Sequence, residues 1–406
     1  MRGAFDASGP SAPQFVVVCA CFVAAIAILV LGQGATFLTD EWDILETRSL
    51  GDPITWLLPH NEHWIAVPVV MYRAIVETVG VGSYLPFLGL LVTFHAISAL
   101  GVYRLFTPSA SWWGVGAAIV LLFLGSGADD LFWAFQIGFV FSAAAGVWAL
   151  VLVRSGAQRD AILSAVLLTA SVASSGVGLC FLAAAAVEAT LTTDLRRSVI
   201  VAVPASLAYV LWFTSFRAQV GIEPSTVAGF QNASSVPGYI LMGIAHTVGS
   251  ATGLGDILGF VTCLLGIALL VTLARHRKPI PPMFIAGTVG LLTLYLLIAI
   301  LRVGIASPEQ SRYVYPGTVL LFVALSGLAE SVRSHVTGRR RLPILAITVL
   351  AFLTNASQLV VESSQFREFG ARTRACEPGA PVIDGGASVE SALLECYLAG
   401  PSGPPA

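Results

Sequence analysis

Residues 14–33 read QFVVVCACFVAAIAILVLGQ, and this stretch decides the fold because it is long and apolar enough to cross a bilayer. A hydrocarbon core of about 30 Å requires about 20 apolar residues in a helix. The stretch carries no charge, is too long for the core of a signal peptide and has no clear cleavage site. The sequence therefore predicts a first transmembrane helix, preceded by a cytoplasmic segment at residues 1–13.

The composition extends this interpretation to most of the chain. Hydrophobic residues make up 56% of the 406 residues and charged residues 11%, whereas about 25% of an ordinary soluble protein is charged. So few charges cannot cover a water-soluble surface, and so many apolar residues exclude disorder for most of the chain. The formal net charge of -2 argues against a nucleic-acid partner, so the expected partner is the lipid bilayer.

Further apolar runs predict an all-α, polytopic bundle of about 11 spans, give or take two, over residues 14–361. The segments 65–80 and 237–255 are apolar but interrupted by Gly, Pro, Arg or His, and we interpret them as re-entrant or interfacial, with spanning as the alternative. The other expected spans are 84–105, 111–127, 131–153, 160–175, 177–193, 198–214, 257–274, 281–301, 313–332 and 343–361.

The basic residues predict the sidedness, since cytoplasmic loops retain Lys and Arg. With the N-terminus in the cytoplasm, every expected inner loop has a basic residue and most acids lie outside. This topology gives a large first outer loop at 34–64 and a flexible extracytoplasmic tail at 362–406. Cys376 and Cys396 lie in that tail, where an oxidising compartment permits a disulfide between them.

The first candidate cluster follows the first helix as Thr39-Asp40-Glu41-Trp42-Asp43. Carboxylates this close repel one another, so such a group tends to bind a cation or to hold a raised proton affinity. The stretch from Trp42 to Leu58 interleaves apolar and polar residues and suits the membrane interface, where lipid-borne substrates arrive. The alternative is a solvated loop whose acids help to set the topology.

The same loop closes with the second cluster, His60-Asn61-Glu62-His63. On a helix, His60 and His63 would share one face and could contact a metal or a phosphate. The spacing matches no standard zinc motif. A polar cap before the next membrane segment is the alternative.

The third cluster is Asp129-Asp130 on the next outer turn, followed by an aromatic-rich stretch and by Gln136 inside the membrane. The aromatic rings could stack on a sugar or an isoprenoid, or form an ordinary aromatic belt. Acids at a helix N-terminus are also stabilised by the macrodipole, so capping is the alternative role of the pair.

The fourth cluster runs from Arg302 to Pro316 and contains Arg312 and Tyr313. A guanidinium at the outer end of a span is well shaped to hold a phosphate through two parallel hydrogen bonds. The alternative is a snorkelling arginine anchored by tyrosines at the headgroup level.

Several motifs that would indicate other chemistry do not occur in the sequence: a GxxxxGK[ST] nucleotide loop, HExxH and GxSxG. Any group donor is therefore expected to be activated already and presented in the membrane. His95 and Glu188, inside expected spans, are interpreted as packing or structural polar groups.

Together these clusters resemble the GT-C superfamily of integral-membrane glycosyltransferases, which use polyprenyl-phosphate sugars. The resemblance rests on Thr39-Asp40-Glu41-Trp42-Asp43, the 60–63 stretch, the Asp129-Asp130 pair and Ser311-Arg312-Tyr313, and its architecture covers most of the chain. It implies that Asp40 or Glu41 is the catalytic base or a metal contact, with Mg or Mn as a possible divalent cation. The residues then expected to bind substrate are Asp43, His60, Asn61, Glu62, His63, Asp129, Asp130, Gln136, Arg312 and Tyr313.

The implied reaction is an inverting displacement in which the base deprotonates a hydroxyl of a glycan, lipid or protein acceptor and polyprenyl phosphate departs. Arg312 and a histidine of the 60–63 stretch would stabilise the departing phosphate. The excess of Arg over Lys, with abundant Ala, Gly and Val, suggests a bacterial chain, so we expect it in the plasma (inner) membrane.

Two other functions are compatible with the sequence. A secondary transporter or flippase of a polar or lipid-linked substrate would place essential groups near the bilayer midplane, accessible from both sides. A glycosyltransferase would place them on the outer face. A non-catalytic partner in envelope assembly could retain the same shape without activity.

Overall fold

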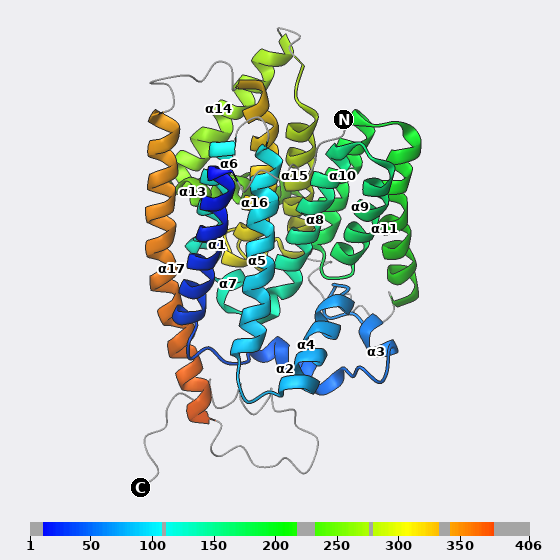
Figure 1. The fold of residues 1–406 in the computed structure, drawn as a ribbon, viewed down its shortest axis with the longest axis vertical. Coiled ribbons are helices and arrows are strands. Elements are labelled where there is room, and N and C mark those ends of the chain that lie inside the picture. The colour runs from blue at the N-terminus through cyan, green and yellow to red at the C-terminus, as the bar shows by residue number, and fades with distance from the viewer. Residues whose placement is uncertain (1–10, 108–110, 217–231, 276–278, 333–341, 377–406) are drawn as a thin grey trace.

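The computed structural model describes residues 11–107, 111–216, 232–275, 279–332 and 342–376, which form helices and turns without a β-strand (Figure 1). The predicted all-α class is confirmed. Within these residues, seven helices are long and apolar enough to cross a membrane, or up to eight if a bent pair counts as one span. They are α1 (Ala12–Leu31), α5 (Leu85–Phe106), α8 (Ile137–Ser155, preceded by the 3-10 turn η2, Ala134–Gln136), α11 (Leu195–Phe216), α15 (Pro282–Arg302), α16 (Ser311–Val332) and α17 (Leu342–Cys376).

Three of the expected spans form shorter helices. The runs 111–127, 160–175 and 177–193 become α6 (Ser111–Leu122), α9 (Gln158–Val172) and α10 (Val177–Thr192), with 12, 15 and 16 residues. Gly- and Ser-containing breaks limit them, because α6 stops at residues 123–127, α9 stops at 173–176, and α10 begins after that second break. The count of about 11 spans therefore stays a prediction.

The two interrupted segments form helices with different surroundings. Segment 65–80 is α4 (Ala66–Val79), which has 14 residues and lies at one end of the bundle. Segment 237–255 contains α13 (Val236–Thr252), which turns by 109° into α14 (Gly255–Arg275). The turn uses Gly253 at φ +69 and Gly255 at φ +75. Residues other than glycine rarely adopt this backbone conformation.

The predicted first outer loop, residues 34–64, is an ordered layer at one end of the bundle (Figure 1). It contains α2 (Thr39–Thr47) and the short α3 (Ile54–Leu57). Arg48 holds the layer together, because its Nη1 donates to the carbonyls of Thr55 and Leu58, and its Nη2 to that of Pro59, at 2.8–3.1 Å. These three hydrogen bonds from one buried side chain to backbone carbonyls fix the path from α2 to His60.

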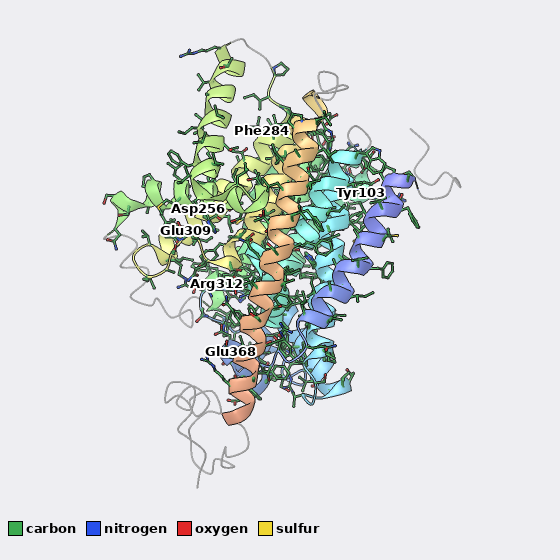
Figure 2. The ribbon with its side chains drawn as sticks, turned by 90° about the vertical axis from the view of Figure 1, so that its left-hand side faces the viewer. Tyr103, Asp256, Phe284, Glu309, Arg312 and Glu368 are labelled. Carbon is green, nitrogen blue, oxygen red and sulfur yellow. The ribbon has the colours of Figure 1, made fainter. Side chains whose placement is uncertain are left out.

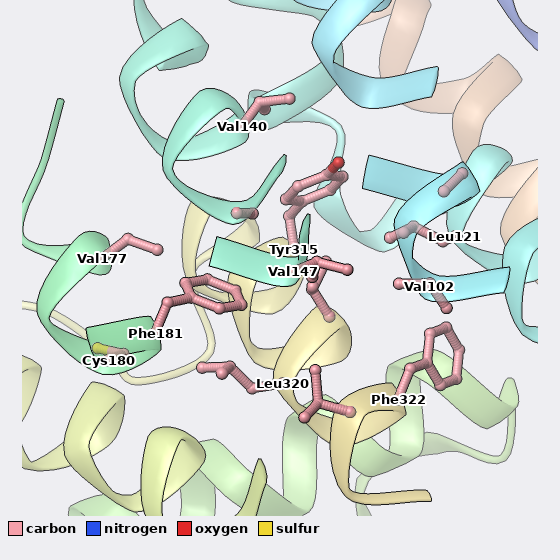
Figure 3. Close-up of a cluster of buried hydrophobic side chains, with 14 of the residues drawn as sticks. Val102, Leu121, Val140, Val147, Val177, Cys180, Phe181, Tyr315, Leu320 and Phe322 are labelled. Atoms are coloured by element: carbon pink, nitrogen blue, oxygen red, sulfur yellow. The ribbon is translucent and has the colours of Figure 1, made fainter. Parts of the chain in front are cut away.

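Close packing of small against large residues builds the core between the helices (Figure 3). Phe181 of α10 and Tyr315 of α16 are fully buried there, among Val147 and Leu320. A Cβ on Gly146 would lie 2.1 Å from Phe181, so only glycine allows α8 and α10 to approach this closely. Many apolar side chains of α1, α11, α14 and α17 remain exposed on the outside, as expected of a membrane-embedded protein.

The last helix differs from the expectation for the tail. We expected the span to end at residue 361 and a flexible tail from 362, but α17 continues to Cys376. Polar helix formers continue it, and Glu368 and Arg372 form an ion pair one turn apart. The rest of the tail, the side chain of Cys376, Cys396 and residues 1–10 lie outside the described residues. The C-terminal end of α17 lies at the same end as α2–α4 (Figure 1), and the side of the membrane that this end faces stays a prediction.

Candidate functional site

A cavity of about 300 Å³ beside α2–α4 brings together residues that lie up to 273 positions apart, from Asp40 to Tyr313. It contains members of the first, second and fourth clusters, together with Gln136 from the stretch after the third. Its charged or polar lining residues include Asp40, His60, Asn61, Glu62, His63, Gln136, Arg302, Arg312 and Tyr313. Figure 2 shows Arg312 in the half of the molecule that contains Glu368, well away from Phe284 and Tyr103.

The 60–63 stretch forms a tight turn instead of the helix on which its shared face was predicted. The backbone amide of His60 donates to the carbonyl of His63 at 3.1 Å, and the amide of His63 donates back at 3.0 Å. Asn61 takes φ +50, which asparagine tolerates better than most residues. The turn directs both histidines toward the cavity but gives them different partners.

His60 lies between two carboxylates. Its Nδ1 is 2.9 Å from Oδ2 of Asp43, and its Nε2 is 3.5 Å from Oδ1 of Asp40. Burial alone would lower the pKa of His60, but the contacts and negative charges of Asp40 and Asp43 outweigh it and raise the pKa to about 9. His60 is therefore a fixed cation at neutral pH. The hydrogen bond with His60 in turn lowers the pKa of Asp43, aided by Arg48 at 3.6 Å.

His63 has a different environment. Burial lowers its pKa; attraction to Glu62 opposes this, and the positive charges of Arg302, His60 and Arg312 add to the lowering. Glu62 forms an ion pair with Arg302 of α15. Burial would raise the pKa of Glu62, but the charges of His63 and Arg302 hold it below its ordinary value.

Gly176, at the start of α10, makes room for the His63 ring. A Cβ on this residue would lie 3.0 Å from Nδ1 of His63. The turn from Ser174 to Gly176 therefore belongs to the cavity wall.

Arg312 begins α16 and is held in place by its neighbours. Its Nε and Nη2 donate to Oε1 of Gln310 at 3.0 and 2.8 Å, and its guanidinium lies 5.4 Å from the ring centroid of Tyr313. Asp129 lies nearby, because its backbone amide donates to the hydroxyl oxygen of Ser311 at 3.1 Å. Burial raises the pKa of Asp129, while the charge and backbone of Arg312 oppose that rise. Asp129 therefore interacts with Arg312 but does not line the cavity.

Asp130 lies outside the cavity, whereas Gln136 lines it. Asp130 is fully buried in α7 (Asp129–Phe132), and neither of its carboxylate oxygens has a hydrogen-bond partner among the described residues. Burial and repulsion from Asp129 raise its pKa well above the ordinary value. Gln136 lines the cavity, and its Oε1 also has no partner within the described parts of the chain.

Glu41 lies outside the cavity, although we expected it to be a candidate base. Its Oε1 accepts the hydroxyls of Tyr72 at 2.5 Å and Tyr84 at 2.9 Å, and its Oε2 accepts the amide of Leu38 at 2.7 Å. Burial raises its pKa to about 7, against these hydrogen bonds. The side chain therefore joins α2, α4 and the start of α5, and of the two candidate bases Asp40 is the one beside the cavity.

The acids and histidines that the structure describes are also candidate ligands for a divalent cation, which needs several of them around one point. In the described ranges, no group of three or more His, Cys, Asp or Glu side chains is arranged to hold a metal ion. Asp40 and Asp43 both approach His60 instead of a common empty point.

Some lining residues were not assigned to the site from the sequence. Arg302 stood at the start of the fourth cluster, but its pairing with Glu62, 240 residues away, has no local signal. The Ser174-Ser175-Gly176 turn and Tyr209 also line the cavity. The sequence indicated this turn only by a short polar break between two apolar runs.

The far wall of the cavity is apolar and reaches the outside of the bundle. It is formed by α10, α11 and α15, with Leu294, Leu297 and Leu301 among its residues. Phe213 and Ile300 also line it, and both are 38% exposed. The cavity thus joins a charged end to an apolar, outward-facing wall.

No protein-family model matches this chain, and no curated protein or solved structure does either.

Proposed function

We propose that the protein is a membrane glycosyltransferase that moves a sugar from a polyprenyl-phosphate donor to an acceptor hydroxyl. The observation that carries the proposal is the two-part cavity, with acids and cations at one end and an apolar wall on α15 and α11. Such a cavity suits a substrate with a charged phosphate and a hydrocarbon chain, since the phosphate can contact the charged end and the chain can contact the apolar wall. The acceptor is a glycan, lipid or protein of the envelope of a bacterium, on the outer face of its plasma membrane.

In this proposal Asp40 is the general base. It takes the proton from the acceptor hydroxyl, the hydroxyl oxygen bonds to the anomeric carbon, and the bond from that carbon to the phosphate oxygen breaks. The electron pair leaves with polyprenyl phosphate, and the configuration inverts. Proton transfer to a placed carboxylate accounts for about 10²–10⁴-fold of the rate.

The departing phosphate gains negative charge, which fixed donors stabilise. Arg312 is preorganised for this by Gln310, and the His60 imidazolium adds a second positive charge beside the cavity. Asn61, Gln136 and Tyr313 supply polar groups for the sugar.

The position of the site favours an enzyme over a carrier. Its charged groups gather beside α2–α4, at one end of the bundle, whereas a transporter predicts them at the midplane.

The test uses the purified chain with a panel of polyprenyl-phosphate-linked hexoses and pentoses and measures release of polyprenyl phosphate in the presence of envelope glycan. We expect release from one donor and loss of at least about 10²-fold in Asp40→Asn. Asp52→Asn is the matched control, because Asp52 is an exposed acid of the same loop that caps the amide of Ile54. No release from any donor, or equal rates in the two variants, would contradict the proposal.

A further inference from the structure

A second cavity, of about 290 Å³, lies at the other end of the helices that form the candidate site. Helices α8 and α10 begin beside the first cavity and end here, while α15 runs the opposite way and starts here. The sequence predicts that this end faces the cytoplasm. Its charged lining residues are Arg154, Glu188, Arg197 and Glu330.

Glu188 is a buried acid in this cavity with one unused oxygen. The residue is 3% exposed, and its Oε2 has no hydrogen-bond partner in the part of the chain that the structure describes. Arg154 does not supply one, because it donates to Oε2 of Glu330 at 2.8 Å and to the carbonyl of Leu105 at 2.8 Å. A buried carboxylate is costly without a donor, so this oxygen calls for a hydrogen-bond donor from a ligand.

Arg197 supplies the opposite charge. Its side chain is 33% exposed, and Asp194 is its ion-pair partner at the long distance of 3.7 Å. Gly156, at φ +72, borders the guanidinium without crowding it, since even a Cβ there would lie at an ordinary contact distance of 3.8 Å from Nη1 of Arg197. A planar guanidinium facing a cavity is suited to a phosphate.

Two exposed leucines lie next to the cavity residues in the chain. Leu191 is 52% exposed and Leu195 is 81% exposed, and these residues flank the cavity residues Thr192 and Thr193 in the chain. Arginines place their apolar stems beside such side chains and their charged heads at the headgroup level of a membrane. A ligand here therefore has access from the interface as well as from water.

We propose that this cavity binds an aminoalkyl phosphate, with the ammonium group donating to Glu188 and the phosphate accepting from Arg197. A phosphate alone would leave Glu188 without its donor, and an amine alone would leave Arg197 without its acceptor. The ligand is either a phosphoethanolamine lipid headgroup or soluble phosphoethanolamine. The proposal does not depend on the reaction proposed for the first cavity.

The experiment uses the purified full chain in detergent and measures bound lipid by native mass spectrometry. Phosphatidylethanolamine and phosphatidylcholine with the same acyl chains are compared, since the choline nitrogen has no N–H to donate to Glu188. We expect phosphatidylethanolamine to bind about tenfold more tightly, the worth of one charge-assisted hydrogen bond. Glu188→Gln should abolish this preference, and Arg197→Gln should weaken both lipids.

Arg196→Gln is the matched control, because Arg196 is the exposed neighbour of Arg197 and does not line the cavity. Competition by soluble O-phosphoethanolamine would assign the site to the soluble ligand, and binding of the lipid without such competition would assign it to the headgroup. Equal binding of the two lipids, or a preference that survives in Glu188→Gln, would overturn the proposal.

Discussion

Asp40 and Glu41 are adjacent in the sequence, yet they have different surroundings in the structure. Successive residues of a helix point about 100° apart, so α2 turns Asp40 to the cavity and Glu41 into the contact with α4 and α5. The sequence predicted an acidic site in this loop but could not choose between the two acids. That choice depends on Tyr72 and Tyr84, which are distant in sequence.

The role of Glu41 can be tested by Glu41→Gln. The amide replaces one acceptor oxygen by a donor, which leaves a tyrosine hydroxyl or the Leu38 amide without its partner. We expect a loss of about 1–3 kcal/mol in the free energy of unfolding, measured by thermal denaturation in detergent. Glu46→Gln, on the exposed face of the same helix, should change the stability little, and equal losses in both variants would contradict this role.

His60 predicts a pH dependence with a defined sign. Its pKa is raised to about 9 in the folded protein, above the unfolded value of about 6.5. The stabilisation by Asp40 and Asp43 is therefore complete below about pH 6.5 and is lost as the pH rises through 9, a change of about 3 kcal/mol. The melting temperature of the native chain should fall between pH 7 and pH 10 by more than that of His60→Asn, and equal falls would show that His60 is not held in this way.

Among the elements, close contacts between distant segments could not be predicted from the sequence. Gly125, in the 3-10 turn η1 (Gly125–Gly127), lies against α17, and a Cβ on it would be 2.2 Å from the carbonyl oxygen of Asn355. Asn355 also accepts the hydroxyl of Ser126 at 2.9 Å. The apolar run at 343–361 predicted a helix here but gave no indication that its middle turns meet this turn.

Gly125→Ala and Gly89→Ala form a matched pair that tests the contact between η1 and α17. The first should destabilise the protein by about 3 kcal/mol or more, because backbone atoms must move apart. Nothing lies within 4 Å of a Cβ on Gly89, inside α5, so alanine there should stabilise the helix by up to about 1 kcal/mol. Melting temperatures that fall in the first variant and rise in the second would confirm the contact between η1 and α17, and similar effects would contradict it.

For the whole molecule, hydropathy and charge predicted the helical membrane-embedded class and the grouping of polar residues at one end. They could not predict that α9 and α10 are short and that α13 bends into α14, since short or bent helices have the same composition as full spans. They also missed the pairing of Glu62 with Arg302, because the two residues meet only when α15 and the first loop are assembled.

The predicted topology can be tested by cysteine labelling in intact cells, with Cys376→Ser and Cys396→Ser as the background. Ser49 is exposed in the first loop, and Arg196 is exposed near the second cavity. Ser49→Cys should react with a membrane-impermeant maleimide, and Arg196→Cys should react only after permeabilisation. The reverse result would put the first cavity on the cytosolic side and contradict the proposed donor.

The length of α17 has a consequence for how the protein tolerates different lipids. Its 35 residues span about 52 Å, well beyond a hydrocarbon core of about 30 Å. The surplus turns pack against the rest of the chain through Phe366, 5.7 Å from the ring of Phe132, and Gly370, against the carbonyl of Gly34. A thinner or thicker membrane therefore meets α17 at different turns without moving these contacts, so the geometry around α7 is insulated from hydrophobic mismatch.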